Sequence, residues 1–259
     1  MVRNDQNGLS FWQFDIFSGF KRLRHGIFTR HGGCSPAPFE SLNVAFATGD
    51  DPANIRENRA RIEKRMGLNG TLYLKQVHGS DLHLHSIVPG RGQAPVADAV
   101  ITARNDQLLV IQTADCQAVL LFDPRRRVVA NVHVGWRGSV ANIIDRTVVA
   151  MVQRFGCDAA DVLAAIGPSL GPCCGEFVNY RKELPRSFWA YRREGDRFDF
   201  WAISHDQLEH AGLRADHIEV SRICTRCRSD ACFSYRAERR TGRMAAVIGM
   251  AGQDNPHPF

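Results

Sequence analysis

The sequence predicts a single α/β domain built on mixed β-sheets, and three observations support this fold class. The chain has 259 residues, of which 44% are hydrophobic, and this is enough to bury a sizeable core. Apolar segments of strand length alternate with amphipathic helical segments, and no linker or internal repeat divides residues 1–259. Residues 117–134 have the pattern of two strands joined by a turn at Asp123 and Pro124. This hairpin predicts antiparallel pairing and disfavours a purely parallel sheet.

Three segments carry the signals of helices. The first begins after the capping residue Asp51, has proline at its first helical position, and ends at Gly67. The second covers residues 140–155, where apolar side chains recur at helical spacing before a glycine. The third is expected to begin at Ser204, which starts a capping-box pattern.

Short runs of apolar and β-branched residues predict the strands that alternate with these helices. Five runs are found, at residues 72–74, 108–111, 118–122, 128–134 and 245–249. The last run is expected to form a strand close to the end of the chain. Together, the helices and strands describe an α/β protein with at least one antiparallel pair.

Charge and hydropathy limit the class of partner. Lys and Arg outnumber Asp and Glu by 33 to 27, and the net charge of +6 favours an anionic ligand without identifying it. The arginines at residues 125–127 lie in the predicted hairpin turn, where charge is ordinarily solvated, so no nucleic-acid partner is expected. No apolar run approaches the roughly 18 residues of a membrane span, and no secretion signal is found. We therefore expect a cytoplasmic protein without a membrane partner; the sequence predicts no oligomeric state.

Cys or His residues stand beside strand-breaking residues at the ends of three apolar runs. The segments are residues 76–79 (QVHG), 113–116 (TADC) and 133–138 (HVGWRG). Strand ends are where α/β folds build their sites. Two imidazoles and a thiolate from His78, Cys116 and His133 would suit Zn²⁺, with the fourth position open to water or substrate. The same residues could instead form a Cys nucleophile with a His base, and their spacing does not choose between the two.

Two further polar residues belong to these segments. Asp115 precedes the cysteine and is a candidate to orient a ligand or to carry a proton. Arg137 is flanked closely by glycines at a predicted helix start. Backbone N–H groups and the guanidinium would together form a cradle for an anion there.

An ordered series of motifs resembles the YfiH-like family, also called the laccase-domain or polyphenol-oxidase-like family. The resemblance covers about residues 26–249 and rests on TRHGGCSPAPFESLNVA, KQVHG, ADAVIT, TADC, HVGWRG, IGPSLGPCC, FSYR and TGRMAAVIG, in that order. It implies a single-domain α/β/β/α sandwich with mixed sheets. It also implies a zinc site, with copper as a weaker alternative, formed by His78, Cys116 and His133.

The resemblance implies a function as well. Members that this chain resembles are zinc-dependent purine nucleoside phosphorylases that act on adenosine, inosine and methylthioadenosine and also deaminate adenosine. A zinc-bound water suits deamination, whereas phosphorolysis requires a bound phosphate and therefore basic residues. The candidates for contacts with phosphate and ribose are Arg30, Asn43, Arg59 and Arg137.

Two other activities stay open. One is a Cys-His amidohydrolase that edits a peptidoglycan precursor, in which Cys116 attacks a carbonyl and His133 or His78 is the base. The other, a copper-dependent polyphenol oxidase, is weaker because it needs a type 1 copper site and a further multinuclear cluster. The one His-x-His pair, His83 and His85, is better explained as exposed or structural.

The other cysteines have no role assigned by the sequence. Besides Cys34 and Cys157, they are Cys173, Cys174, Cys224, Cys227 and Cys232. Cys224 and Cys227 form a Cys-x-x-Cys pair. Because a structural zinc needs four converging ligands and no second Cys-x-x-Cys is found, the pattern favours packing over a second metal site.

Overall fold

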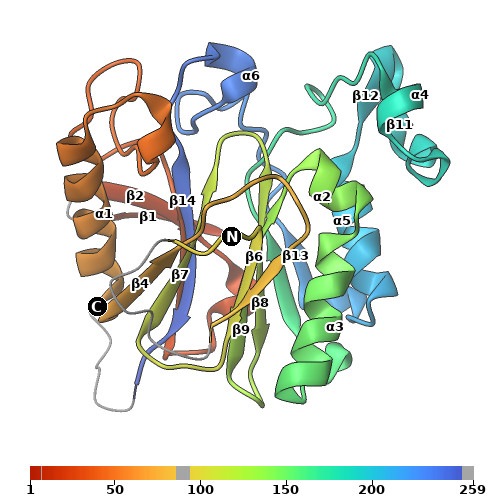
Figure 1. The fold of residues 1–259 in the computed structure, drawn as a ribbon, viewed down its shortest axis with the longest axis horizontal. Helices are drawn as coiled ribbons and strands as arrows, with labels where there is room; N and C mark the ends of the chain where they lie inside the picture. Colours follow the sequence, from red (N-terminus) through yellow and green to blue (C-terminus); the bar gives the residue numbers. More distant parts are fainter. Residues whose placement is uncertain (7, 86–93, 253–259) are drawn as a thin grey trace.

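Two six-stranded β-sheets pack face to face in the computed structural model, which describes residues 1–6, 8–85 and 94–252 (Figure 1). The first sheet has the strand order β1, β2, β3, β14, β7, β4. The bounds in that order are Val2–Gln6, Leu9–Gln13, Leu23–Phe28, Met244–Met250, Gln107–Thr113 and Gly70–Tyr73. β4 pairs parallel with β7 and the other neighbours pair antiparallel, so the sheet is mixed.

The second sheet is also mixed and has the order β13, β10, β8, β9, β6, β5. The bounds in that order are Ile218–Val220, Leu163–Ile166, Gln117–Asp123, Val128–Val134, Ala99–Thr102 and Leu82–Leu84. The outer pairs β13–β10 and β6–β5 are parallel, and the inner pairs are antiparallel. The antiparallel pair β8–β9 confirms the hairpin that the sequence predicts.

Helices cover the outer faces of the two sheets (Figure 1). α1 (Pro52–Met66) lies on the first sheet, whereas α3 (Ile143–Phe155) and α5 (Phe200–His210) lie on the second. The layers are therefore α/β/β/α, as the resemblance implies. Shorter elements are the helices α2 (Trp136–Val140), α4 (Tyr180–Glu183) and α6 (Tyr235–Glu238) and the ribbon of β11 (Arg192–Arg193) with β12 (Arg197–Phe198).

Short 3-10 segments complete the described secondary structure. They are Asp15–Phe17, Phe46–Thr48, Ala159–Asp161, Arg186–Tyr191, Glu194–Asp196 and Ala215–His217. Across the residues with described positions, no helix is both long and apolar enough to cross a membrane.

The first helix follows the sequence prediction, but the other two begin elsewhere. Asp51 caps α1 by accepting a hydrogen bond from the N–H of Ala53 at 2.7 Å. α3 begins only at Ile143, because Asn142 takes a left-handed conformation and separates it from α2. α5 begins at Phe200 rather than at Ser204, whose side chain is buried within the helix and donates to Gln117 Oε1 at 2.5 Å.

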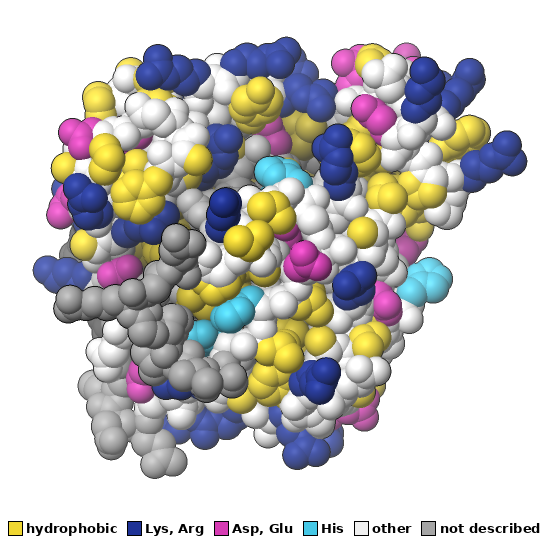
Figure 2. Space-filling model, in the orientation of Figure 1, with side chains coloured by type: hydrophobic (Ala, Val, Ile, Leu, Met, Phe, Trp, Pro, Cys, Tyr) yellow, Lys and Arg dark blue, Asp and Glu magenta, His cyan; other side chains and the backbone are white. Residues whose placement is uncertain are grey.

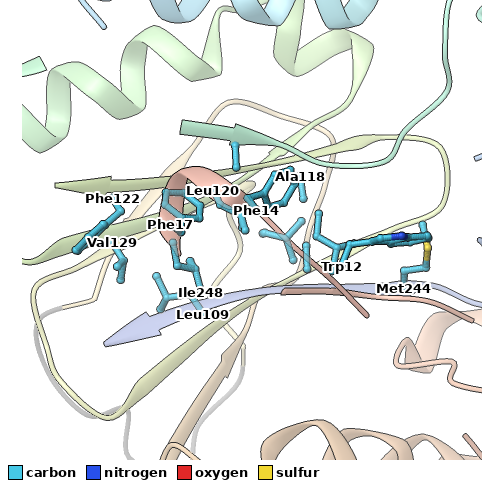
Figure 3. Close-up of a cluster of buried hydrophobic side chains, with 14 of the residues drawn as sticks. Trp12, Phe14, Phe17, Leu109, Ala118, Leu120, Phe122, Val129, Met244 and Ile248 are labelled. Atoms are coloured by element: carbon cyan, nitrogen blue, oxygen red, sulfur yellow. The ribbon is translucent and has the colours of Figure 1, made fainter. Parts of the chain in front are cut away.

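The alternation of side chains along the central strands divides the core into layers. On β7, Leu109 and Ile111 face the second sheet, whereas Leu108 and Val110 pack with α1. β8 alternates in the same way between the first sheet and α3. Both sheets are thus apolar on both faces. Figure 3 shows the inner layer, in which Leu109 and Ile248 of the first sheet meet Leu120, Phe122 and Val129 of the second.

A buried amide joins the two sheets across this apolar layer. Asn131 lies in the middle of β9 and is fully buried. Its Nδ2 donates to the carbonyl oxygen of Leu109 on β7 at 3.0 Å and to that of Ala246 on β14 at 2.9 Å. Because hydrogen bonds in a dry interior have strict geometry, this amide fixes how β9 sits against the first sheet.

We predict that Asn131→Ala lowers the free energy of unfolding by about 2–4 kcal/mol, because it removes two buried hydrogen bonds and leaves a cavity. Urea unfolding followed by circular dichroism measures the change. Asn105→Ala is the control, since Asn105 only accepts a hydrogen bond from Arg127 on the exposed hairpin turn. A loss below about 1 kcal/mol for Asn131→Ala would contradict the role given to this amide.

Candidate active site

The three strand-end segments converge at one end of the sandwich. β7 ends in the first sheet and β8 begins in the second, so Cys116 lies where the chain crosses between the sheets. His133 is the penultimate residue of β9, and His78 lies in the loop between β4 and β5. The ligand atoms of His78, Cys116 and His133 all lie within 4.8 Å of one another.

The backbone around these residues is shaped to bring them together. The rings of His78 and His133 are 4.9 Å apart and nearly perpendicular, at 82°. A Cβ at Gly135 would lie only 3.2 Å from Cδ2 of His78 and 3.4 Å from Sγ of Cys116, so glycine leaves the space that the three groups require. His78 and Asp115 have positive φ angles of 59° and 90°, which non-glycine residues seldom adopt outside sites that hold them in place.

The carboxylate of Asp98 holds both histidine segments. Its Oδ1 is 2.7 Å from Nδ1 of His133 and accepts a hydrogen bond from the backbone N–H of His78 at 3.0 Å. Its Oδ2 accepts from the backbone N–H groups of Val77 at 3.2 Å and Gly79 at 2.7 Å. Asp98 is completely buried. This carboxylate therefore orients the ring of His133 so that Nε2 is free to bind a ligand.

The protonation states of these groups depend on one another. Burial alone would raise the pKa of the Cys116 thiol, but the charge of His133 and hydrogen bonds from both imidazoles lower it to about 6. Burial alone would lower the pKa of His133, but the Cys116 thiolate and Asp98 raise it. Burial would raise the pKa of Asp98 too, yet hydrogen bonds from His133 and the backbone keep it below its ordinary value. Cys116 is accordingly held as a thiolate.

This donor set fits a metal ion. A thiolate and two imidazoles are ligands that zinc and copper both accept. A carboxylate on the far nitrogen of one histidine is the usual support of such a ligand. Three such ligands would leave a further position open to a substrate from the cavity described next.

A cavity of about 870 Å³ opens over the three residues. Its charged side chains are mostly cationic: Arg59, Lys75, Arg137, Arg236 and Arg243, with Asp115 as the one acidic group among them. Its aromatic side chains are Phe46, Tyr73, Trp136, Phe177, Phe200 and Tyr235. Lys and Arg side chains are also spread over the upper part of the surface in Figure 2, at the end that carries α2 and α6. The cavity therefore combines positive charge with flat apolar surfaces.

Arg137 and Arg59 differ in how much of their hydrogen-bonding capacity is used. The guanidinium of Arg137 stacks over the ring of Trp136 at 4.0 Å and has no hydrogen-bond or salt-bridge partner among the described residues. The guanidinium of Arg59 lies 3.6 Å from the centre of the Tyr73 ring, and its Nε donates to the carbonyl of Val44 at 2.8 Å. Burial lowers the pKa of Arg59. Arg137 is thus the more available cation for an incoming anion.

Asp115 contributes hydrogen bonds to the loops around the cavity. Its Oδ1 accepts from Thr225 Oγ1 and from Ser234 Oγ, each at 2.7 Å, and its Oδ2 accepts from the N–H of Arg236 at 2.6 Å. These bonds hold the turn that presents Cys116. They give Asp115 a positioning part, with its carboxylate already shared among three donors.

Arg30 and Asn43 do not line the cavity, in contrast to the sequence prediction that they contact phosphate or ribose. Arg30 is paired with Glu238 at 2.6 Å and donates to the carbonyls of Glu40 and Ser229. Asn43 is fully buried and donates to Asp50 Oδ2 at 2.9 Å. Both side chains are therefore used to hold the loops that precede α1.

Three residues of this site, Asp98, Arg236 and Arg243, were not predicted from the sequence. Asp98 lies in the ADAVIT motif, where an acidic residue before an apolar strand was the available signal. Arg236 and Arg243 lie in the FSYR and TGRM motifs, and they reach the cavity although they are more than 100 residues from Cys116 in sequence. His83 and His85 stay outside the cavity, and His85 is buried with Nε2 3.2 Å from Gln107 Oε1.

Comparisons with known proteins agree along nearly the whole chain. Residues 24–251 match a family model described as multi-copper polyphenol oxidoreductase laccase. A purine nucleoside phosphorylase of Deinococcus radiodurans is 37% identical over 238 residues, which cover 87% of this chain and 88% of that protein. The purine nucleoside phosphorylase YfiH of Escherichia coli is 31% identical, covering 85% of this chain and 90% of that protein.

A solved structure shares the fold. The crystal structure of YlmD from Geobacillus stearothermophilus superposes with a TM-score of 0.87 at 30% sequence identity. The match covers 96% of this chain and 98% of that one. The two-sheet architecture is therefore common to both proteins.

We predict that Asp98→Asn weakens metal binding by about 10- to 100-fold, because an amide cannot accept hydrogen bonds on both sides from four N–H donors. Competition against a chromophoric chelator measures the affinity, and circular dichroism reports whether the variant folds. Asp81→Asn is the matched control, since the side chain of Asp81 is exposed and lies in the loop that carries His78. An Asp98→Asn protein that is folded and binds metal as tightly as the unchanged protein would contradict this role.

Proposed function

Because the chain belongs to the multi-copper polyphenol oxidoreductase laccase family, whose relatives here are named purine nucleoside phosphorylase, we propose that it is a purine nucleoside phosphorylase that uses zinc. We propose adenosine, inosine and methylthioadenosine as its substrates and deamination of adenosine as a second activity. The observation that carries the proposal is a site with two histidines and a cysteine at the base of a cationic, aromatic cavity.

The lining of the cavity supports a nucleoside and a phosphate as ligands. Aromatic rings offer flat apolar surfaces to a purine base. Guanidinium groups bind phosphate by charge-assisted hydrogen bonds. Arg137 is the proposed phosphate ligand because, among the described residues, its guanidinium has no hydrogen-bond or salt-bridge partner and contacts the ring of Trp136. Arg59 and Arg243 lie deeper and add positive charge, and burial lowers the pKa of both.

In phosphorolysis, the residues around the cavity would have separate roles. An oxygen of phosphate forms a bond to C1′ of the ribose while the bond from C1′ to the purine breaks, and the purine leaves with the electron pair. Arg137 would hold the phosphate in line with C1′, and positioning of this kind accounts for much of the rate. Zinc held by His78, Cys116 and His133 would supply Lewis-acid chemistry beside the bound nucleoside. Asp115 keeps the turn before Cys116 in place.

The copper oxidase activity that the family description names is the weaker proposal for this chain. A multi-copper oxidase requires a type 1 site and a separate multinuclear cluster. The described residues offer one group with two histidines, His78 and His133, and His85 is engaged with Gln107 elsewhere. The cationic cavity also has no use in the oxidation of a neutral phenol.

A Cys-His amidohydrolase is the second candidate, and one observation favours it. Asp98, His133 and Cys116 stand in the order of an orienting carboxylate, a base and a nucleophile. That arrangement serves a metal ligand set and a thiol nucleophile equally well. Metal content and phosphate dependence separate the two proposals.

We predict that the protein converts adenosine to adenine and ribose 1-phosphate only when phosphate is present, and that it forms inosine without phosphate. Chelation should abolish both reactions and added zinc should restore them, because the Lewis acid is removed and returned. Chromatography of the products after each incubation measures this. Cys116→Ala is expected to lose both reactions, with Cys34→Ala as the control for an exposed cysteine outside the site.

Two results would contradict the proposal. Adenosine left unchanged by the zinc-loaded protein would exclude both activities. An active protein without metal that forms an acyl adduct at Cys116 would instead establish the amidohydrolase.

We also predict that Arg137→Gln raises the KM for phosphate about tenfold or more while the KM for the nucleoside changes little, because one charge-assisted contact is lost. Initial rates at varied phosphate measure the effect. Arg146→Gln removes the same charge from the exposed side of α3 and should leave both KM values unchanged. Equal phosphate KM values for the Arg137→Gln and unchanged enzymes would place the phosphate elsewhere.

A further inference from the structure

Four cysteines from two separate loops meet beside the second sheet. Cys173 and Cys174 lie in the loop after β10, and Cys224 and Cys227 lie in the loop after β13. Because β10 and β13 are parallel neighbours, their C-terminal ends lie at the same edge and deliver both loops to one place. We call Cys173, Cys174, Cys224 and Cys227 the four-cysteine cluster.

The sulfur atoms of the four-cysteine cluster are close enough to share one ion. All four Sγ atoms lie within 4.8 Å of one another. Cys227 Sγ is 3.5 Å from Cys173 Sγ and 3.6 Å from Cys174 Sγ. A zinc ion with Zn–S bonds of about 2.3 Å places tetrahedral sulfurs about 3.8 Å apart, within this range. A disulfide would need about 2.0 Å, and no pair among the eight cysteines is bonded.

Backbone hydrogen bonds hold the two loops in register. The pairing of β10 with β13 is extended by Ser169, whose N–H donates to Ile223 at 3.1 Å and whose carbonyl accepts from Thr225 at 3.0 Å. The N–H of Gly171 donates to Cys224 Sγ at 3.3 Å. Hydrogen bonds from backbone N–H groups to sulfur are the support that thiolate ligands of a metal require.

Each cysteine pair also lies on a tight turn. The N–H of Cys174 donates to the carbonyl of Gly171 at 2.9 Å, and the N–H of Arg228 donates to the carbonyl of Cys224 at 2.9 Å. A Cβ at Gly171 would lie 2.7 Å from the Trp201 ring and 3.1 Å from Cβ of Cys224, so only glycine permits this approach. The four thiols are thus placed by the fold itself.

We propose that the four-cysteine cluster binds a structural zinc ion, separate from the site at His78, Cys116 and His133. Four thiolates at tetrahedral spacing form a closed ligand set, which leaves no position for a substrate. Zinc accepts this set without redox chemistry, as expected for a site that holds loops in place. The Cys-x-x-Cys pair finds its partners in a vicinal pair, Cys173 and Cys174, in place of a second Cys-x-x-Cys.

This second zinc would brace the wall of the active-site cavity. Ser169 and Leu170, which precede the cysteine pair, line the cavity. The N–H of Leu170 donates to the carbonyl of Asp115 at 2.8 Å, and Thr225, inside the Cys-x-x-Cys, donates to the Asp115 carboxylate. These two hydrogen bonds connect the loops of the four-cysteine cluster to the turn that carries Cys116.

Metal analysis of variants tests the proposal without any assay of nucleoside chemistry. The unchanged protein should hold about two zinc ions per chain, and Cys116→Ser should keep about one, because its four-cysteine cluster is intact. The double variant Cys173→Ser/Cys227→Ser removes two exposed ligands and should also keep about one. Cys34→Ser is the matched control and should keep about two, since Cys34 is exposed and outside both sites.

Two further readouts keep the test decisive if a variant folds poorly. In native Cys116→Ser protein, the cluster thiols should resist alkylation until a chelator is added, and peptide mapping identifies them. Loss of the cluster zinc should lower Tm by about 5 °C or more, whereas Cys34→Ser should not change it.

Three results would overturn the assignment. A Cys116→Ser protein that holds no metal and whose four cluster thiols alkylate freely would exclude the site. Iron in place of zinc would exclude the zinc assignment. A chain isolated with Cys173 or Cys174 oxidised to a disulfide would make the cluster a redox pair. None of these results bears on whether the protein cleaves nucleosides.

Discussion

The carboxylate of Asp98 is the group on which the geometry of the active site depends. It directly precedes β6, and it is completely buried, which would be costly for a charge without partners. Four N–H groups offset that cost: the ring of His133 and the backbone of Val77, His78 and Gly79. One residue thus fixes both the ring of His133 and the backbone that carries His78. The thiolate of Cys116 is the third group of the site, beside the two histidines that Asp98 positions.

The two-sheet architecture explains why the site forms at this end of the molecule. The chain passes from the first sheet to the second between β7 and β8, and Cys116 stands at the crossing. The cavity opens at this crossing and is lined by residues from both sheets. Asn131 holds the sheets together below it, through hydrogen bonds to Leu109 and Ala246. Two buried polar side chains therefore act in different places: Asn131 connects the two sheets, and Asp98 positions His78 and His133.

Sequence patterns correctly predicted features that depend on only a few neighbouring residues. The cap at Asp51 and the turn at Asp123 act within a few residues, and both were found where expected. The convergence of His78, Cys116 and His133 was suggested by strand ends and by the resemblance, because strand ends collect at the edges of sheets. The starts of α3 and α5 were wrong, since a left-handed residue and a buried serine competed with the capping patterns.

Other contacts between distant residues could not be predicted from the sequence, because they depend on strand order. Arg30 and Asn43 were predicted to contact phosphate or ribose, yet their side chains have carboxylate or carbonyl partners outside the cavity. The four-cysteine cluster was missed for the same reason. Only the parallel pairing of β10 with β13 brings Cys174 next to Cys227. No spacing rule predicts a vicinal pair as the partner of a Cys-x-x-Cys.

Asp115 connects the turn that carries Cys116 with the loops of the four-cysteine cluster, and its backbone conformation is strained. A φ of 90° is unfavourable for a residue with a side chain, by about 1–3 kcal/mol. Three hydrogen bonds from Thr225, Ser234 and Arg236 to its carboxylate compensate for this strain, and all three donors lie in the segment after β13. That segment is also the one that the four-cysteine cluster fixes. The strained turn before Cys116 therefore depends on the loops that donate these hydrogen bonds. A closed metal site at the four-cysteine cluster would stabilise this turn by fixing those loops.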